Sequence, residues 1–381
     1  MSLFTAILVD KKNKICEIKI HFTALEVIVL NHWYIICKYS FMKNLLLTPI
    51  ACFFSISVFS QNIDSAQFYV KKGIAEKNSR LFAVAAKDFD KAISFNQNYT
   101  EAYIENGNVN LEMRKMDAAV GNYIKAYQLE PANNEVIKQL SNLYLNNRQF
   151  AKAIELAEKC NSCEDGDRIM GMSYYNLEDY GKAETFLQKA IKKNNKDAES
   201  AYTLGRTYIE LENEKAAIPQ YQNAITLEPA RNMWIYELGL IYYNQEDYKN
   251  ALKYFNSAGD AGYNKTNDYY ENVGFAQLYT NDTENGVKTL NGVLDKKPNN
   301  KELINNMAYA MYTTKKYDDA LTYYQKLLEL NPKDASSLFM AGMTFQKKGE
   351  KEKGQKICDK AIEMDPSLAK NRQKKEMPTG L

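Results

Sequence analysis

The most regular pattern in the chain consists of small and apolar residues spaced three or four positions apart, a spacing typical of one face of a helix. Residues 198–231 contain two such runs, separated by a polar stretch that favours a turn. A proline ends the second run, because proline lacks the backbone N–H that a helix interior needs. The residues that mark the pattern here are Ala201, Leu204, Gly205, Tyr208, Ala217, Tyr221, Ala224 and Pro229.

The same pattern recurs at intervals close to 34 residues through most of the chain. Small residues let the two predicted helices approach closely, and a bulky residue on the second helix fills the space beside them. One such helix pair cannot bury its apolar face alone, so the pairs are expected to stack on one another. The small residue of the first helix falls at Gly73, Gly107, Ser141, Gly171, Gly205, Gly239, Gly274, Ala308 and Gly342.

The period and its markers resemble the tetratricopeptide repeat, over about Ala66 to Leu368. The resemblance implies an all-α fold: a right-handed α-solenoid of about nine helix-turn-helix repeats with a C-terminal capping helix. The solenoid would occupy residues 61–368, and residues 369–381 would form the cap helix and tail. The nine repeats, numbered 1 to 9 in chain order, would span about 66–99, 100–133, 134–163, 164–197, 198–231, 232–265, 267–300, 301–334 and 335–368.

The N-terminal part of the chain lacks the repeat. Residues 42–60 have the layout of a secretory signal peptide, with a basic start, a short apolar run and small residues at its end. We therefore expect an exported bacterial protein, located in the periplasm or at the cell envelope. Residues 1–41 are then either upstream sequence read through from a start at Met42 or an extension that does not fit the repeat. Two alternatives remain open: retention of Leu45–Phe59 as an anchor, and lipidation of Cys52.

The charge balance narrows the choice of partner. Without residues 1–60 the chain has 43 Lys and Arg against 44 Asp and Glu, a formal net charge of −1. A nearly neutral surface without a basic run argues against nucleic acid as a ligand. It argues equally against an anionic membrane, unless the apolar segment is retained or Cys52 is lipidated. A protein or a peptide is the expected partner.

The residue types needed for common catalytic sites are missing after the predicted signal peptide. Both histidines, His21 and His32, precede it, which removes Ser-His and Cys-His pairs and imidazole metal ligands. No glycine-rich phosphate loop is present, because the glycines are spread over the repeats at packing positions. We therefore expect no enzyme activity, no catalytic residues, no cofactor and no metal site.

The cysteines Cys160 and Cys163 form one CxxC pair at the end of repeat 3. A redox-active thiol is favoured near a helix N-terminus, whereas Cys160 is expected near the C-terminal end of a helix. Core packing of Cys160 and a disulfide between the two cysteines both remain possible, and in an exported protein the disulfide would connect repeat 3 to repeat 4.

The resemblance also implies a binding surface. In tetratricopeptide repeats the first helix of each pair lines a concave groove, into which the fifth, ninth and twelfth repeat positions point. Aromatic side chains are frequent anchors of interfaces, although many of these tyrosines could instead pack against the next helix pair. The predicted groove residues are Lys138, Asn142, Arg168, Met172, Tyr175, Tyr202, Arg206, Tyr236, Leu240, Tyr243, Phe275, Tyr309, Tyr312 and Phe339.

Three functions are consistent with these observations. The first is a non-enzymatic protein–protein interaction scaffold that binds a peptide or protein segment in its concave groove. The second is an envelope-anchored assembly factor that docks a membrane complex, and the third is a glycan-binding module that uses tyrosine rings as stacking platforms. Binding of a chaperone tail is not expected, because Lys138 and Asn142 match the first pair of the known carboxylate clamp but Glu199 and Thr203 do not continue it.

Overall fold

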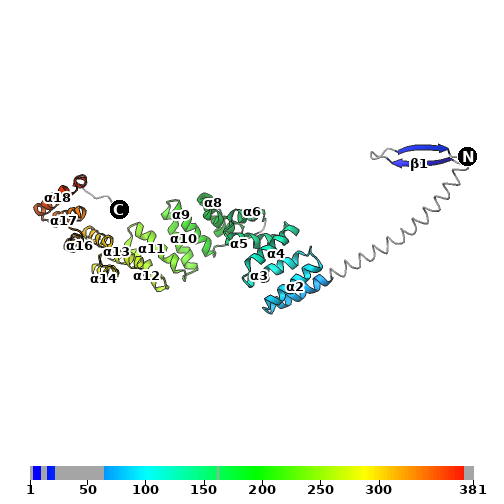
Figure 1. Cartoon of the computed structure of the whole chain (residues 1–381), viewed down its shortest axis with the longest axis horizontal. Helices are drawn as coiled ribbons and strands as arrows, with labels where there is room; N and C mark the ends of the chain where they lie inside the picture. Colours follow the sequence, from blue (N-terminus) through cyan, green and yellow to red (C-terminus); the bar gives the residue numbers. More distant parts are fainter. Residues whose placement is uncertain (1–2, 10–14, 22–63, 161–162, 373–381) are drawn as a thin grey trace. The chain divides into compact units, whose positions relative to one another are not determined.

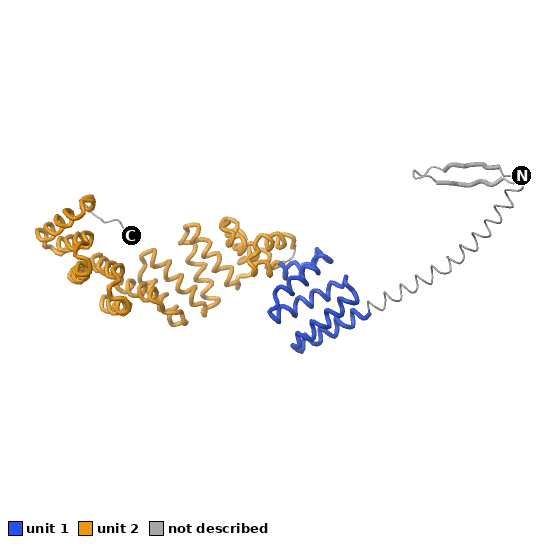
Figure 2. Tube along the Cα trace, viewed as in Figure 1, with its two compact units in different colours: residues 1–140 blue, residues 141–381 orange. Residues whose placement is uncertain are grey.

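The computed structural model describes residues 3–9, 15–21, 64–160 and 163–372 (Figure 1). Two compact units are distinguished, residues 1–140 and residues 141–381 (Figure 2). The predictions for a signal peptide at 42–60 and for lipidation of Cys52 lie outside the described residues.

Two short strands near the N-terminus form an antiparallel hairpin. Strand β1 (Leu3–Val9) pairs with β2 (Ile15–His21), so that Leu3 lies opposite His21 and Val9 opposite Ile15. In β2 apolar and charged residues alternate, which is the period of a strand. Nothing in the helical repeat pattern predicts this hairpin.

The helices follow one another in pairs, as the repeat predicts. Unit 1 contains the helical residues 64–78 and then α2 (Phe82–Phe95), α3 (Thr100–Glu112) and α4 (Met116–Leu129). Helix α5 (Asn134–Asn146) spans the division between the units. The helices of unit 2 are α6 (Phe150–Lys159), α7 (Gly166–Asn176), α8 (Tyr180–Lys193), α9 (Ala198–Glu210), α10 (Glu214–Leu227), α11 (Asn232–Asn244), α12 (Tyr248–Asp260), α13 (Asn267–Tyr279), α14 (Thr283–Leu294), α15 (Lys301–Thr313), α16 (Tyr317–Leu330), α17 (Ala335–Lys348) and α18 (Lys351–Met364).

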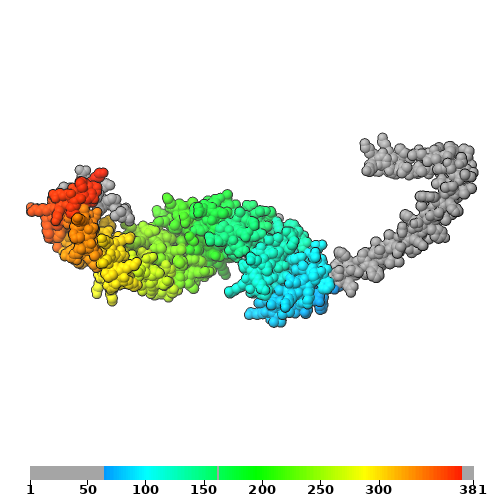
Figure 3. Space-filling view, in the orientation of Figure 1, coloured from blue at the N-terminus to red at the C-terminus, as the bar shows by residue number. Residues whose placement is uncertain are grey.

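The helical region is an all-α repeat solenoid. In unit 2 from repeat 4 onward, each first helix packs against the second helix of its own repeat, and that helix packs against the first helix of the next. In the space-filling view these repeats follow one another without a gap (Figure 3). A 3-10 helix, η1 (Pro366–Arg372), follows α18, so the helical turn after the last repeat begins at Pro366 rather than at Ala369 as predicted.

The core of each repeat has the predicted contact between a small and a bulky residue. A Cβ atom built on Gly205 would lie 2.7 Å from the ring of Tyr221, and one on Gly239 would lie 2.6 Å from the ring of Phe255. No larger residue fits there without movement of its neighbours. Tyr221 and Phe255 are themselves buried. The glycines therefore allow the two helices of a repeat to approach each other closely.

The turn between the two helices of a repeat is the same in all nine described pairs, and its geometry was not predicted. One residue adopts a left-handed backbone conformation, and the N–H of the next residue donates to the carbonyl five positions earlier, as from Asp247 to Tyr242 at 2.9 Å. This is the Schellman arrangement that ends many helices, usually with glycine in the left-handed position. Here only the last repeat has glycine. The left-handed residues are Arg80, Arg114, Arg148, Glu178, Glu212, Glu246, Asn281, Lys315 and Gly349.

Candidate functional site

First helices of consecutive repeats contact one another directly in unit 2. The hydroxyl of Tyr202 on α9 donates a hydrogen bond to Glu237 on α11 at 3.1 Å. From α13, the side-chain amide of Asn272 donates to the hydroxyl of Tyr236 on α11 at 2.7 Å. We call the surface presented by α7, α9, α11, α13 and α15 the first-helix face. These helices carry the predicted groove residues of repeats 4 to 8.

Three predicted groove residues meet on this face. The guanidinium carbon of Arg206 lies 5.2 Å from the centre of the Tyr175 ring and 5.9 Å from that of Tyr202. Arg206 is exposed, and no carboxylate in the described part of the chain forms an ion pair with it. Arg168, by contrast, pairs with Asp197 at 3.5 Å and with Glu199. Arg206 is therefore an arginine held between aromatic rings and available to a partner.

Four predicted groove residues are core side chains instead: Met172, Tyr236, Phe275 and Phe339 are each less than a tenth exposed. The reason is coverage by neighbouring elements, since Tyr236 stacks on Tyr263 at 4.3 Å. Phe339 belongs to a buried cluster with Cys358 and with Leu368 of η1. The remaining predicted residues, all half-buried, are Lys138, Asn142, Leu240, Tyr243, Tyr309 and Tyr312.

In one group of tyrosines the hydroxyls are hydrogen-bonded to another residue of the protein. Tyr202 and Tyr221 donate to the two carboxylate oxygens of Glu237, at 3.1 Å and 2.9 Å. Trp234 stacks on Tyr202 with ring centres 4.5 Å apart. Burial, together with the charge of Glu237, raises the pKa of both Tyr202 and Tyr221. We call Tyr202, Tyr221, Trp234 and Glu237 the inner cluster. Its hydroxyls already have partners, so its role is structural.

A second group of tyrosines lies at the turn edge of the first-helix face. In repeats 4, 6 and 8 a tyrosine near the end of the first helix contacts another at the start of the second helix. The ring centres of these pairs lie 5.2 Å to 6.2 Å apart. Only the first member of each pair was predicted, although tyrosines five residues apart are visible in the sequence. The pairs are Tyr175 with Tyr180, Tyr243 with Tyr248, and Tyr312 with Tyr317.

At this edge, repeats 6 to 8 form a pocket of about 540 Å³, which we call the tyrosine pocket. Tyr248 and Tyr279 stack with ring centres 4.3 Å apart, and Tyr309 also lines the pocket. Burial, the two neighbouring phenols and Glu246 raise the pKa of Tyr279 to about 12. Within the described ranges, none of these three phenol groups forms a hydrogen bond. The polar residues that complete the lining are Glu246, Asn281, Thr313, Thr314 and Lys315.

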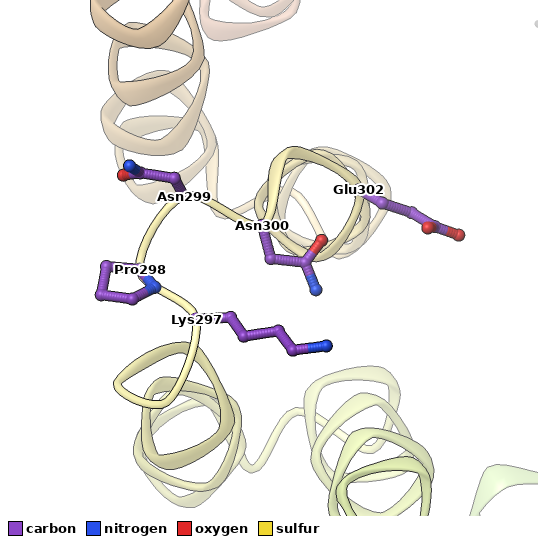
Figure 4. Close-up of a pocket in the computed structure, with 5 residues that line it drawn as sticks. All are labelled: Lys297, Pro298, Asn299, Asn300 and Glu302. Carbon is purple, nitrogen blue, oxygen red and sulfur yellow. The ribbon is translucent and has the colours of Figure 1, made fainter.

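Another pocket, of about 510 Å³, lies along the loop between α14 and α15 (Figure 4). In this view the side chains of Lys297 and Asn300 point toward the same opening. A neighbouring pocket of about 330 Å³ also includes Glu271, whose pKa is raised by burial and by the nearby carboxylates of Asp268 and Glu302. Neither pocket has an aromatic wall, so both lack the anchors found at the tyrosine pocket.

The structure joins Cys160 and Cys163 by a disulfide, with their Cα atoms 5.5 Å apart. Cys160 is the residue that follows α6, where the sequence places the end of repeat 3. The third cysteine of the described residues, Cys358, is buried in α18, where its thiol donates to the backbone carbonyl of Phe339 at 3.7 Å. None of the three cysteines faces the tyrosine pocket.

In the described part of the chain, no group of three or more His, Cys, Asp or Glu side chains could hold a metal ion. Among the helices of residues 64–372, apart from the gap at 161–162, none is long and apolar enough to cross a membrane.

Comparison with known proteins identifies the repeat. Models of the tetratricopeptide repeat match residues 170–226, 202–264, 302–334 and 335–368. The chain is also similar to RNA polymerase II-associated protein 3 of Rattus norvegicus and of Homo sapiens, at 35% and 34% identity over 83 residues. That match covers 22% of this chain and only 11% of each relative.

Solved structures include two similar repeat proteins. The C-terminal part of a repeat-containing protein from Cytophaga hutchinsonii is 20% identical, with a TM-score of 0.44, and the match covers 63% of this chain and 99% of that one. YrrB, described as a TPR protein with an unusual peptide-binding site, is 23% identical with a TM-score of 0.40, over 46% of this chain and 93% of that one. From its repeats and their matching models, this chain belongs to the tetratricopeptide repeat family.

Proposed function

We propose that this protein-interaction scaffold binds a segment of a partner protein along its first-helix face, across repeats 4 to 8. The observation that carries the proposal is Arg206, exposed and without an ion pair among the described residues, held against the rings of Tyr175 and Tyr202. An arginine in this position can bind a carboxylate of the partner through two parallel hydrogen bonds. The aromatic contacts hold its side chain in place, so less conformational entropy is lost on binding.

The turn-edge tyrosines would supply the remaining contact area. Tyrosine is enriched at interface hot spots, because it offers a large ring and a hydroxyl at a low cost in side-chain entropy. Tyr175, Tyr309 and Tyr312 are partly covered by their neighbours, which fixes their orientation while part of each ring stays exposed. This arrangement supports recognition of an extended or helical segment rather than of a small molecule.

The proposed function involves no catalysis, in keeping with the typically non-catalytic character of tetratricopeptide repeats. We also propose that residues 42–60 direct export to the periplasm or cell envelope. N-terminal sequencing of the protein isolated from its natural source tests this proposal, with a start near Gln61 as the expected result. A start at Met1 or Met42, or a lipid on Cys52, would instead favour an assembly factor anchored at the envelope.

A glycan-binding function is less well supported. Sugar recognition depends on hydroxyl groups that are open to the ligand, and the inner cluster offers none, because the hydroxyls of Tyr202 and Tyr221 are bonded to Glu237.

Crosslinked capture with the full chain as bait tests the proposed function. The wild type is compared with Arg206→Glu and with Lys215→Glu, the same charge change on α10 of the same repeat. Both positions are exposed, so both variants are expected to fold, which circular dichroism verifies. We expect the wild type and Lys215→Glu to recover the same partner and Arg206→Glu to lose it. Equal recovery by all three proteins would show that the partner binds elsewhere.

A further inference from the structure

We infer that the tyrosine pocket binds an arginine side chain of the partner segment. This inference rests on the proposed function, since it names the side chain that one end of the bound segment inserts. The pocket is the place where repeats 6, 7 and 8 together form a cavity on the first-helix face. Its volume of about 540 Å³ falls in the range of sites that enclose a ligand group.

The phenols of the pocket can donate or accept, and the other polar side chains of the lining add several acceptors. The hydroxyls of Thr313 and Thr314 donate their protons to the backbone carbonyl of Ala310, at 3.0 Å and 2.7 Å. Toward a ligand these oxygens can therefore only accept. Glu246 adds two carboxylate oxygens, and the side chain of Asn281 adds an amide oxygen. A ligand group with many donors fits this lining best.

The aromatic walls favour a cation that is also flat. The faces of tyrosine rings carry partial negative charge and attract cations within about 6 Å. The stacked rings of Tyr248 and Tyr279 lie beside the carboxylate of Glu246, which attracts the same charge. A guanidinium group is planar, stacks on aromatic rings and carries five donors, whereas the ammonium of lysine is compact and carries three. Arginine therefore matches the pocket better than lysine.

The charge of Lys315 affects an arginine ligand and an acidic ligand in opposite directions. It lies at the rim of the pocket, where its charge opposes a bound cation, and its side chain is exposed to solvent. Removal of this charge should strengthen binding of an arginine, whereas it should weaken binding of an acidic group. The sign of the change at Lys315 therefore distinguishes between the two kinds of ligand.

The test uses N-acetyl-arginine N-methylamide as the probe, and the citrulline analogue, which is uncharged and nearly identical in shape, as the reference. Binding to the full chain is followed by NMR of ring-labelled tyrosine at low salt. We expect the arginine probe to bind about two- to fivefold more tightly than citrulline, since cation–π attraction at exposed sites is modest. Glu246→Gln should weaken arginine binding about two- to fivefold, and Lys315→Gln should strengthen it.

Glu178→Gln is the matched control, because Glu178 has the same left-handed turn position in repeat 4 but lies outside the pocket. It should leave arginine binding unchanged. Equal binding of citrulline and arginine, no loss in Glu246→Gln, or weaker binding in Lys315→Gln would each overturn the inference. The proposed function is judged separately by the Arg206→Glu capture, so it can stand even where the arginine probe fails.

Discussion

The inner cluster and the tyrosine pocket both belong to unit 2, and both contain partly or fully buried tyrosine rings. They differ in what the hydroxyl groups do. Tyr202 and Tyr221 donate to Glu237, whereas the phenols of Tyr248, Tyr279 and Tyr309 have no hydrogen-bond partner in the described part of the chain. Ring burial alone therefore does not separate structural tyrosines from tyrosines that are available to a partner. The hydrogen bond of the hydroxyl does.

The largest expected difference between the two regions follows from removal of their carboxylates. Glu237→Ala leaves the buried hydroxyl of Tyr221 without its acceptor, and we expect it to lower the free energy of unfolding by about 2–3 kcal/mol. Glu246→Ala should change it by less than about 0.5 kcal/mol, because Glu246 is an exposed turn residue. Urea unfolding followed by circular dichroism and by the fluorescence of Trp234, in a Trp33→Phe background, measures both.

A compensating variant sharpens this first test. In the Glu237→Ala background, the change of both Tyr202 and Tyr221 to Phe removes the unpaired hydroxyls and should restore about 1 kcal/mol. Equal losses in Glu237→Ala and Glu246→Ala, or no recovery in the compensated variant, would show that hydrogen bonding does not distinguish the two regions.

The next largest effect concerns the glycine beside the inner cluster. Gly205→Ala places a methyl group against the ring of Tyr221, and we expect a loss of about 1–3 kcal/mol from overpacking. Gly292→Ala on α14 meets no atom within 4 Å and should gain about 0.5–1 kcal/mol from the better helix propensity of alanine. Thermal unfolding of the two variants gives the comparison. A gain in both would mean that Tyr221 moves aside without cost.

The helix pairs and their close packing were predictable from the sequence, because they depend on residues within one repeat. Gly205 and Tyr221 are a fixed distance apart in the chain, so their contact follows from two helices and one turn. Burial of residues on the first helices depends on the element that follows each repeat. Phe339 occupies the same repeat position as Tyr202, but a cluster that includes Leu368 of η1 covers it, and this could not be read from its position.

Two other features escaped prediction for different reasons. The left-handed turn residues are charged in most repeats, so the usual signal of a glycine is missing. The tyrosine pocket joins Tyr248, Tyr279 and Tyr309, which come from three repeats and from three different repeat positions. A pattern aligned within one repeat does not show that such residues meet.

Alkaline pH offers a third test of the comparison, through Tyr279. Its pKa is raised from 10.0 to about 12 by burial, the neighbouring phenols and Glu246. Because the pKa is higher in the folded form, the neutral phenol stabilises the folded form. This stabilisation is fully present below pH 10 and is lost as the pH rises through about 12. We expect Tyr279→Phe to reduce the fall in stability over this interval by about 1–2 kcal/mol. Chemical unfolding at several pH values measures it, with Tyr317→Phe as the control. An unchanged slope in Tyr279→Phe would show that this phenol is not protected by its pocket.

The smallest expected effect tests whether the turns beside the tyrosines are strained. Glu212, at φ 55°, adopts a left-handed conformation that costs most residues about 1–2 kcal/mol, whereas glycine adopts it freely. Glycine also loses more backbone entropy on folding, which offsets part of this relief. We therefore expect Glu212→Gly to raise the free energy of unfolding by about 0.5–1 kcal/mol. Asn281→Gly should gain only a few tenths, because asparagine tolerates this conformation at φ 64°. Thermal unfolding compares the two variants, and a loss in Glu212→Gly would mean that the glutamate makes a contact worth more than the strain of its backbone.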